Sequence, residues 1–180
     1  MELIEQAFRI AVVAHKDQVR KTDGSPYIIH PLMVANIVRR HGFAETVCAA
    51  AVVHDVLEDT EFSEETLRDE LGSQVVDIVT AVSEDKTLEW ELRKEEYVKA
   101  VVAAGEEVWA VSVGDKIHNA QSMLEYYKAV GPDLWSSFNR GKEQKLWFEK
   151  MLLKSLESVW QHPILEEYAA LVVELEALEG

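Results

Sequence analysis

Two adjacent ionisable residues, His54 and Asp55, interrupt an apolar stretch of the chain. Five small apolar residues, AAAVV, come directly before them, and a second acidic pair, Glu58 and Asp59, follows. On a helix, positions four apart share a face, so His54 would stack with Glu58 and Asp55 with Asp59. A buried carboxylate needs a partner, and a divalent metal ion would supply one. A plainer interpretation, a helix whose polar end leaves the core, fits these residues equally well.

Two further segments favour the metal interpretation. His30 stands at a predicted junction of loop and helix in YIIHP, and Asp115 follows an apolar run in VGDKIHN, near a predicted helix start. With His54 and Asp55 they make two imidazoles and two carboxylates. This mixed set of nitrogen and oxygen ligands suits Mn²⁺, Fe²⁺ or Zn²⁺ better than Ca²⁺ or Mg²⁺.

The elements that must position these residues have the spacing of helices. Apolar residues recur every three to four positions between residues 3 and 12, which predicts a first helix. Gly24 and Pro26 predict a loop over KTDGSPYII, and PLMVANIVRRHG then predicts a helix that ends at Gly42. The next helix, from about residue 45, is expected to carry HDVLED on its last two turns.

Later helix boundaries follow from the same local signals. Ser63 is predicted to cap a helix that ends at Gly72, and Ser73 to cap the helix after it. The last helix is expected over residues 163–178, opened by a proline. At the usual helix length of about a dozen residues, the chain predicts a single all-α domain over residues 1–180, a bundle of about eight to ten helices.

The composition is that of a folded globular protein. The chain has 180 residues, of which 48% are apolar, enough for one sizeable core. No apolar run approaches the roughly 20 residues needed to span a bilayer, so no membrane partner is expected. The start, MELIEQAFRI, lacks the features of a signal peptide, and Cys48 is the single cysteine. We therefore expect a cytoplasmic protein.

The acidic character of the chain restricts its partners. The formal net charge of −15 argues against nucleic-acid binding, which needs an electropositive surface. It would also repel a phosphorylated small molecule unless the site itself were locally positive.

The candidate ligands and their flanking residues resemble a known family. The order H…HD…D, with HDVLEDT in the middle and GDKIHN later, is similar to the HD phosphohydrolase superfamily. Three longer segments, HKDQVRKTDGSPYIIHP, HDVLEDTEFSEETLRDELG and VSEDKT, resemble the hydrolase domain of RelA/SpoT-type proteins, which remove the 3′-pyrophosphate from the alarmone ppGpp. The resemblance covers about residues 3–160. From the length of the chain we expect no synthetase or regulatory region, which would make it similar to the free-standing small alarmone hydrolases of the metazoan SpoT homologue type.

This resemblance implies an HD-domain fold and a role for each site residue. The implied ligands of one Mn²⁺ ion are His30, His54, Asp55 and Asp115. The implied catalytic residues are Glu58 and Asp59. The residues expected to bind the nucleotide and its phosphates are Arg20, Lys21, Lys86, Lys116, Asn119 and Ser122.

The implied reaction is Mn²⁺-dependent hydrolysis of (p)ppGpp to GDP or GTP and pyrophosphate. A bound divalent ion makes water a stronger nucleophile at neutral pH. Glu58 would orient or deprotonate that water, and Asp59 would return a proton to the leaving 3′-oxygen. Two neighbouring carboxylates can divide the acid and base roles when their pKa values differ; which residue takes which role is left open.

Three positions depart from the family pattern. Gly114 stands before Asp115 where alanine is usual, which we interpret as a packing difference. Gln121 replaces a common arginine, and Trp147 stands in place of a common tyrosine. The last two are expected near the nucleotide, so they bear on substrate identity.

Competing functions remain at the level of the sequence. The same chemistry could act on adenine alarmones, (p)ppApp, or remove phosphate from NADPH. A non-catalytic alarmone sensor is the rival of another class, although such a sensor would need neither Glu58 nor Asp59. The oligomeric state is left open, with a homodimer as one option.

Overall fold

The computed structural model describes residues 1–20 and 23–180, and their regular structure is helical. In chain order the helices are α1 (Leu3–Ala14), α2 (Ile29–Arg40), α3 (Glu45–Val52), α4 (Val56–Asp59), α5 (Glu64–Leu71), α6 (Ser73–Val82), α7 (Trp90–Ala104), α8 (Glu106–Val130), the 3₁₀ helix η1 (Gly131–Ser137), α9 (Gly141–Glu157) and α10 (Pro163–Ala177). The β-structure of these residues is limited to one isolated bridge between Val19 and Pro26. The all-α expectation is confirmed.

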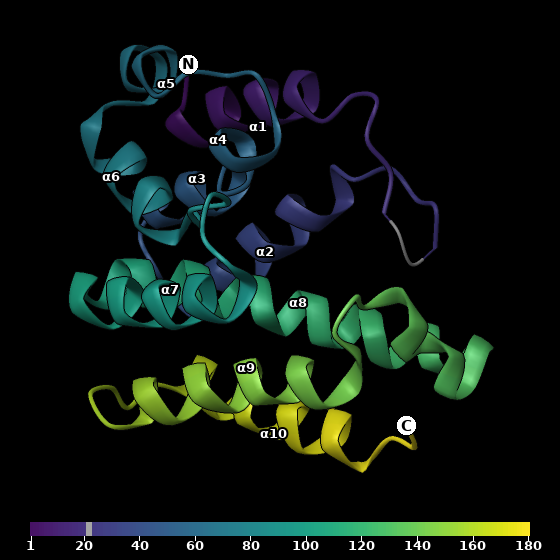
Figure 1. Cartoon of the computed structure of the whole chain (residues 1–180). Helices are drawn as coiled ribbons and strands as arrows, with labels where there is room; N and C mark the ends of the chain where they lie inside the picture. The colour runs from purple at the N-terminus through teal and green to yellow at the C-terminus, as the bar shows by residue number, and fades with distance from the viewer. Residues whose placement is uncertain (21–22) are drawn as a thin grey trace.

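Helix α8 is the central element of the bundle. It runs across the middle of the molecule, with α9 and α10 on one side and α1 to α6 on the other (Figure 1). Helices α2, α3, α6 and α10 all pack against it. In the described part of the chain, no helix is both long and apolar enough to cross a membrane. That residues 1–180 form one domain stays a prediction.

Helix α3 is buried because its residues are small and apolar. All positions from Val47 to Val52 are inaccessible or nearly so. Short side chains let neighbouring helices approach closely, and α3 packs against α1, α2, α6 and α8. The apolar run before His54 is therefore a core element that carries the following residues to the centre of the molecule.

Several predicted helix ends are confirmed. The hydroxyl oxygen of Ser63 accepts a hydrogen bond from the backbone N–H of Thr66 at 3.1 Å, as an N-cap should. Gly42 and Gly72 follow their helices with φ of 86° and 82°, a conformation that residues with a Cβ rarely adopt.

Three local expectations were wrong. Helix α3 ends at Val52 and a turn over residues 53–55 separates it from the short α4, so HDVLED does not continue one helix. Asp115 lies within the long α8 and not near a helix start. Ser73 is the first residue of α6 and its side chain caps nothing, because Gly72 occupies the cap position.

Candidate active site

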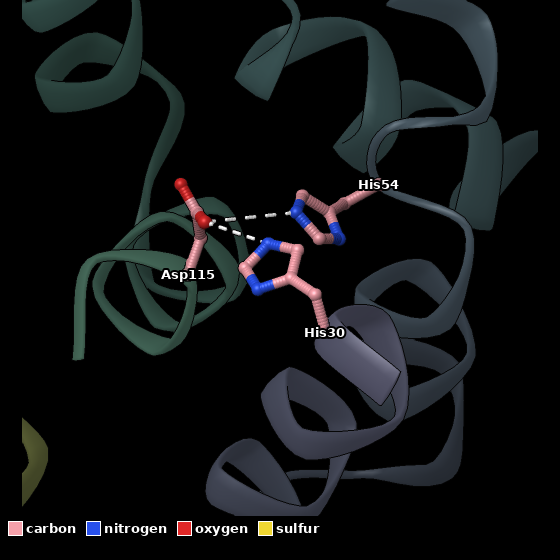
Figure 2. A group of neighbouring side chains, drawn as sticks. All are labelled: His30, His54 and Asp115. Carbon is pink, nitrogen blue, oxygen red and sulfur yellow. Dashed lines mark ion pairs between the residues drawn. The ribbon is translucent and has the colours of Figure 1, made fainter. Parts of the chain in front are cut away.

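Three ligand-type side chains from different parts of the bundle converge on one point. His30 comes from the first turn of α2, His54 from the turn between α3 and α4, and Asp115 from α8 (Figure 2). The Nε2 atoms of His30 and His54 lie 3.0 Å and 3.8 Å from Oδ1 of Asp115. One ligand atom from each of the three residues lies within 4.8 Å of the others, a spacing that allows one metal ion to bind all three.

Asp55 completes the predicted group of His30, His54, Asp55 and Asp115, which we call the ligand cluster. Its Oδ2 lies 3.0 Å from Nε2 of His54 and 3.6 Å from Nε2 of His30. The same oxygen accepts a hydrogen bond of 2.6 Å from the hydroxyl of Tyr27. The break after α3 explains this placement, since adjacent residues on a continuous helix would point about 100° apart.

The surroundings of His54 favour a positive charge at its Nε2 atom. Its Nδ1 lies 2.8 Å from the carbonyl oxygen of Ala51, so Nδ1 carries the hydrogen and donates it. Its Nε2 is buried without a hydrogen-bond partner among the described residues and faces two carboxylates. Burial would lower the pKa of His54, yet Asp55 and Asp115 raise it well above its ordinary value. A proton or a metal ion satisfies this nitrogen, and the surrounding donor set fits the metal.

Neighbouring groups hold the other ligand-type residues in place. Nδ1 of His30 lies 2.7 Å from Nδ1 of His118. Asp115 accepts hydrogen bonds from Lys116 at 2.6 Å and from Asn119 at 2.5 Å. Burial by itself would raise the pKa of Asp115, but Lys116 and the two imidazoles hold that pKa well below its ordinary value. The carboxylate is therefore ionised and oriented at neutral pH.

The two candidate catalytic carboxylates face different spaces. Glu58 lines a polar cavity of about 140 Å³ together with His30, His54, Asp55 and Asp115. Asp59 lines a larger cleft of about 580 Å³. Burial, with a smaller effect of nearby carboxylates, raises the pKa of Glu58. A raised pKa suits a group that exchanges protons near neutral pH.

Lys86 bridges the same two carboxylates. Its Nζ lies 2.6 Å from Oδ1 of Asp59 and 3.4 Å from Oε1 of Glu58. The backbone N–H of Glu84 also donates to Glu58, at 3.2 Å. The segment SEDKT thus packs against the two candidate catalytic carboxylates, which hold its lysine in this structure.

We call the cavity lined by the candidate metal ligands the metal cavity. It adjoins the cleft, because Tyr27 and Asn119 line both. Arg20 lines the cleft and donates to Oδ1 of Asn119 at 3.1 Å. Ser122 lines it as well, while Lys116 lines the metal cavity. Five of the six residues expected at the nucleotide therefore lie at or beside these two spaces. The sixth, Lys21, is outside the described residues.

The two expected base contacts lie elsewhere. Gln121 extends toward α10, with its Nε2 at 3.4 Å from Glu167, and it lines a separate depression. The ring of Trp147 lies 5.8 Å from that of Trp90 and packs against the core. Neither residue lines the cleft. Gly114 does have a packing role, since a Cβ there would lie 3.0 Å from Val38 of α2.

Two site residues were not found from the sequence. Tyr27 lies three positions before His30, in the turn that enters α2, where the N–H of His30 donates to the carbonyl oxygen of Tyr27 at 2.8 Å. This nearness in sequence was the available signal. Lys145 lines the cleft from α9. No local motif marks it, because α9 reaches the cleft only through tertiary packing.

Comparisons with known proteins place this chain in a family. A family model described as HD domain matches residues 7–140. The guanosine-3′,5′-bis(diphosphate) 3′-pyrophosphohydrolase MESH1 of Xenopus tropicalis is 33% identical over 153 residues, which cover 83% of each chain. A probable GTP pyrophosphokinase of Mycobacterium leprae is 33% identical over 127 residues, 68% of this chain and 16% of that protein. The chain spans only 14–18% of the first curated relatives it matches.

Solved structures share the same architecture. The protein lmo0812 of Listeria monocytogenes EGD-e superposes with a TM-score of 0.77 at 36% identity, covering 81% of this chain and 97% of that one. A metazoan ortholog of SpoT that hydrolyses ppGpp superposes with a TM-score of 0.81, covering 99% of this chain and 98% of that one. At 22% identity, this second likeness concerns the fold alone. The chain therefore belongs to the HD domain family, and within that family it is a relative of the guanosine-3′,5′-bis(diphosphate) 3′-pyrophosphohydrolases.

Proposed function

We propose that this protein hydrolyses the 3′-pyrophosphate of guanosine tetra- and pentaphosphate alarmones, (p)ppGpp, to give GDP or GTP and pyrophosphate. The observation that carries this proposal is the convergence of two imidazoles and two carboxylates beside a cleft of nucleotide size. The relationship to MESH1, which extends over most of both chains, supports the substrate class.

We propose a single Mn²⁺ ion as the cofactor, held by His30, His54, Asp55 and Asp115. Two nitrogen and two carboxylate ligands suit Mn²⁺, and the buried Nε2 of His54 supports a cation at this point. When bound, such an ion activates water and withdraws charge from a phosphoryl oxygen.

Glu58 is the residue we assign to the attacking water. It lines the cavity of the ligand cluster, and burial raises its pKa, which makes the carboxylate a stronger base than an exposed glutamate. The oxygen of the water forms a bond to phosphorus as the bond from phosphorus to the 3′-oxygen breaks. The proton of the water passes to Glu58.

Asp59 is the residue we assign to the leaving group. It lines the cleft where the ribose would lie, next to Asn119 and Ser122. A proton given to the 3′-oxygen completes the nucleoside product. Arg20, Lys21, Lys86 and Lys116 would gather the phosphates, and Lys86 would exchange its present carboxylate partners for phosphate oxygens.

The lining of the cleft bears on the choice of nucleobase. Beside its polar residues, the cleft presents the apolar side chains of Val19, Met123 and Phe138. Apolar surfaces and aromatic rings accept guanine and adenine alike. We therefore expect (p)ppGpp to be cleaved with weak discrimination against (p)ppApp.

One experiment separates the candidate functions. Metal-loaded protein is incubated with ppGpp, pppApp or NADPH, and the products are identified by chromatography. Release of pyrophosphate from ppGpp is the expected result. If pppApp or NADPH is cleaved rapidly and ppGpp is not cleaved, the substrate assignment is wrong. Tight binding of ppGpp without turnover would favour a sensor.

A further inference from the structure

Three lysine side chains gather around the ring of Phe148 on α9. The Nζ atoms of Lys94, Lys116 and Lys145 lie 4.5, 5.3 and 6.0 Å from its centroid. They come from α7, α8 and α9, and their side chains are 15%, 10% and 17% exposed. We call these residues the Phe148 lysine cluster. In a chain with a net charge of −15, the cluster concentrates positive charge beside the metal cavity.

The three lysines face different surroundings. Lys94 pairs with Glu84, and Lys116 donates to Asp115 at 2.6 Å in the wall of the metal cavity. Lys145 is the member of the cluster that lines the nucleotide cleft. Lys94 and Lys116 are therefore held behind the site, whereas Lys145 can reach a ligand in the cleft.

The partner of Lys145 would keep one hydrogen bond if the lysine turned to a ligand. Lys145 pairs with Glu149, one turn further along α9, and Glu149 is buried. The hydroxyl of Tyr168 also donates to the same carboxylate. Glu149 thus holds Lys145 in place in this structure and keeps a hydrogen bond in its absence.

We propose that Lys145 binds the 5′-diphosphate of the nucleotide and so selects substrates that carry phosphate at both ends. This inference rests on the proposed function. The 3′-pyrophosphate belongs in the cavity of the ligand cluster, and Tyr27 and Asn119 mark its junction with the cleft. Arg20 is tied to that junction through Asn119. Arg20 and Lys145 are the cations among the described residues lining the cleft, so Lys145 is the one left for the 5′-phosphates.

A binding experiment tests this inference without hydrolysis. Calorimetry compares GDP with guanosine on the wild-type protein and on Lys145→Met. A lost charge-assisted hydrogen bond should weaken GDP binding about 10- to 100-fold and leave guanosine binding unchanged. Lys145→Arg keeps the charge and should restore most of the affinity. Lys150→Met, also on α9 but paired with Glu176 and half-exposed, is the matched control and should alter neither ligand.

A second variant guards against a folding effect. Lys145→Met/Glu149→Gln removes both members of the buried pair, and it should show the same selective loss of GDP binding. Equal weakening of GDP and guanosine, or a wild-type protein that binds GDP no better than guanosine, would overturn the inference.

Steady-state kinetics test the role of Lys145 independently. Lys145→Met should raise KM for ppGpp about 10- to 100-fold with little change in kcat, and should not affect guanosine 3′-diphosphate with a free 5′-hydroxyl. An equal rise in KM for ppGpp and for guanosine 3′-diphosphate would contradict a role of Lys145 at the 5′-diphosphate. A wild-type protein that releases no pyrophosphate from either substrate would refute the proposed function, and the GDP measurements would still decide the role of Lys145.

Discussion

At the scale of single residues, the proposed site depends on charges that compensate one another. Asp55 and Asp115 lie against two imidazoles, and Nε2 of His54 lacks a hydrogen-bond partner among the described residues. Without a cation, this arrangement would bring lone pairs toward each other in a buried space. A divalent ion resolves the conflict for all four side chains at once.

Removing one carboxylate should therefore remove the metal. Asp55→Ala and Asp115→Ala should each lose bound Mn²⁺ and essentially all turnover, because a charged ligand is gone. Metal content measured by mass spectrometry, beside circular dichroism to verify the fold, is the check. Asp77→Ala, on the exposed face of α6, is the control and should keep its metal. A folded Asp115→Ala variant with full metal content would show that the ligand set is wrong.

Glu58 should separate chemistry from binding. Glu58→Gln keeps the shape of the side chain and removes its basic carboxylate, so metal and substrate should still bind. Turnover should fall by roughly two to four orders of magnitude, the usual contribution of a positioned acid or base. Steady-state kinetics and a metal assay on the same sample test this. Near-normal kcat in the variant would be incompatible with the assigned role.

The raised pKa of Glu58 also has a consequence for stability. As pH rises, the unfolded chain releases the Glu58 proton first, because burial raises the pKa in the folded protein. Its contribution to stability is thus present below the ordinary pKa of glutamate and is lost as pH rises through the raised pKa. In chelator, Glu58→Gln should lack this decline and be at least as stable as the wild type at neutral pH. Thermal melts at several pH values would show it; a less stable variant at neutral pH would contradict it.

At the scale of elements, the sequence predicted features that depend on neighbouring residues in the chain and missed those that depend on contacts between helices. The cap at Ser63 and the glycines after α2 and α5 were predictable, because each acts on its own backbone. The turn after Val52 was not, since HDVLED has helical spacing and no glycine or proline. The chain turns at this point because His54 and Asp55 both meet the rest of the ligand cluster there. The contributions of Tyr27 and Lys145 depend on which helices meet, which no single segment encodes.

Close packing of α8 on α2 should control the geometry of the ligand cluster. A Cβ at Gly114 would lie 3.0 Å from Val38 and 3.4 Å from Val34, so Gly114→Ala should push apart the helices that carry Asp115 and His30. Overpacking of this kind costs about 1–3 kcal/mol, against about 1 kcal/mol gained from helix propensity. We expect a lower Tm and weaker Mn²⁺ binding.

The matched control for this variant removes the obstructing methyl groups. Gly114→Ala/Val38→Ala should bind Mn²⁺ more tightly than Gly114→Ala alone, because the new Cβ then has room. Isothermal titration measures both affinities. If Gly114→Ala binds Mn²⁺ like the wild type, the contact between α2 and α8 does not set the ligand geometry.

At the scale of the whole molecule, the ligand cluster joins parts of the bundle that are distant in sequence. A bound ion would connect α2, the turn after α3, and α8, and so would favour the folded state. At Mn²⁺ a hundredfold above its dissociation constant, linkage contributes about 2.7 kcal/mol. For a chain of this length that is about 5–10 °C in Tm. Melts with excess Mn²⁺ and with chelator should differ by this amount for the wild type and not for Asp115→Ala; equal shifts in both would place the ion elsewhere.

The most direct test of the central claim follows the oxygen of water. Mn²⁺-loaded protein is incubated with ppGpp in ¹⁸O-labelled water, and the products are analysed by mass spectrometry. If water attacks the phosphorus attached to the 3′-oxygen, one ¹⁸O atom appears in pyrophosphate and GDP remains unlabelled. Label in GDP, release of orthophosphate in place of pyrophosphate, or unchanged ppGpp would contradict the account.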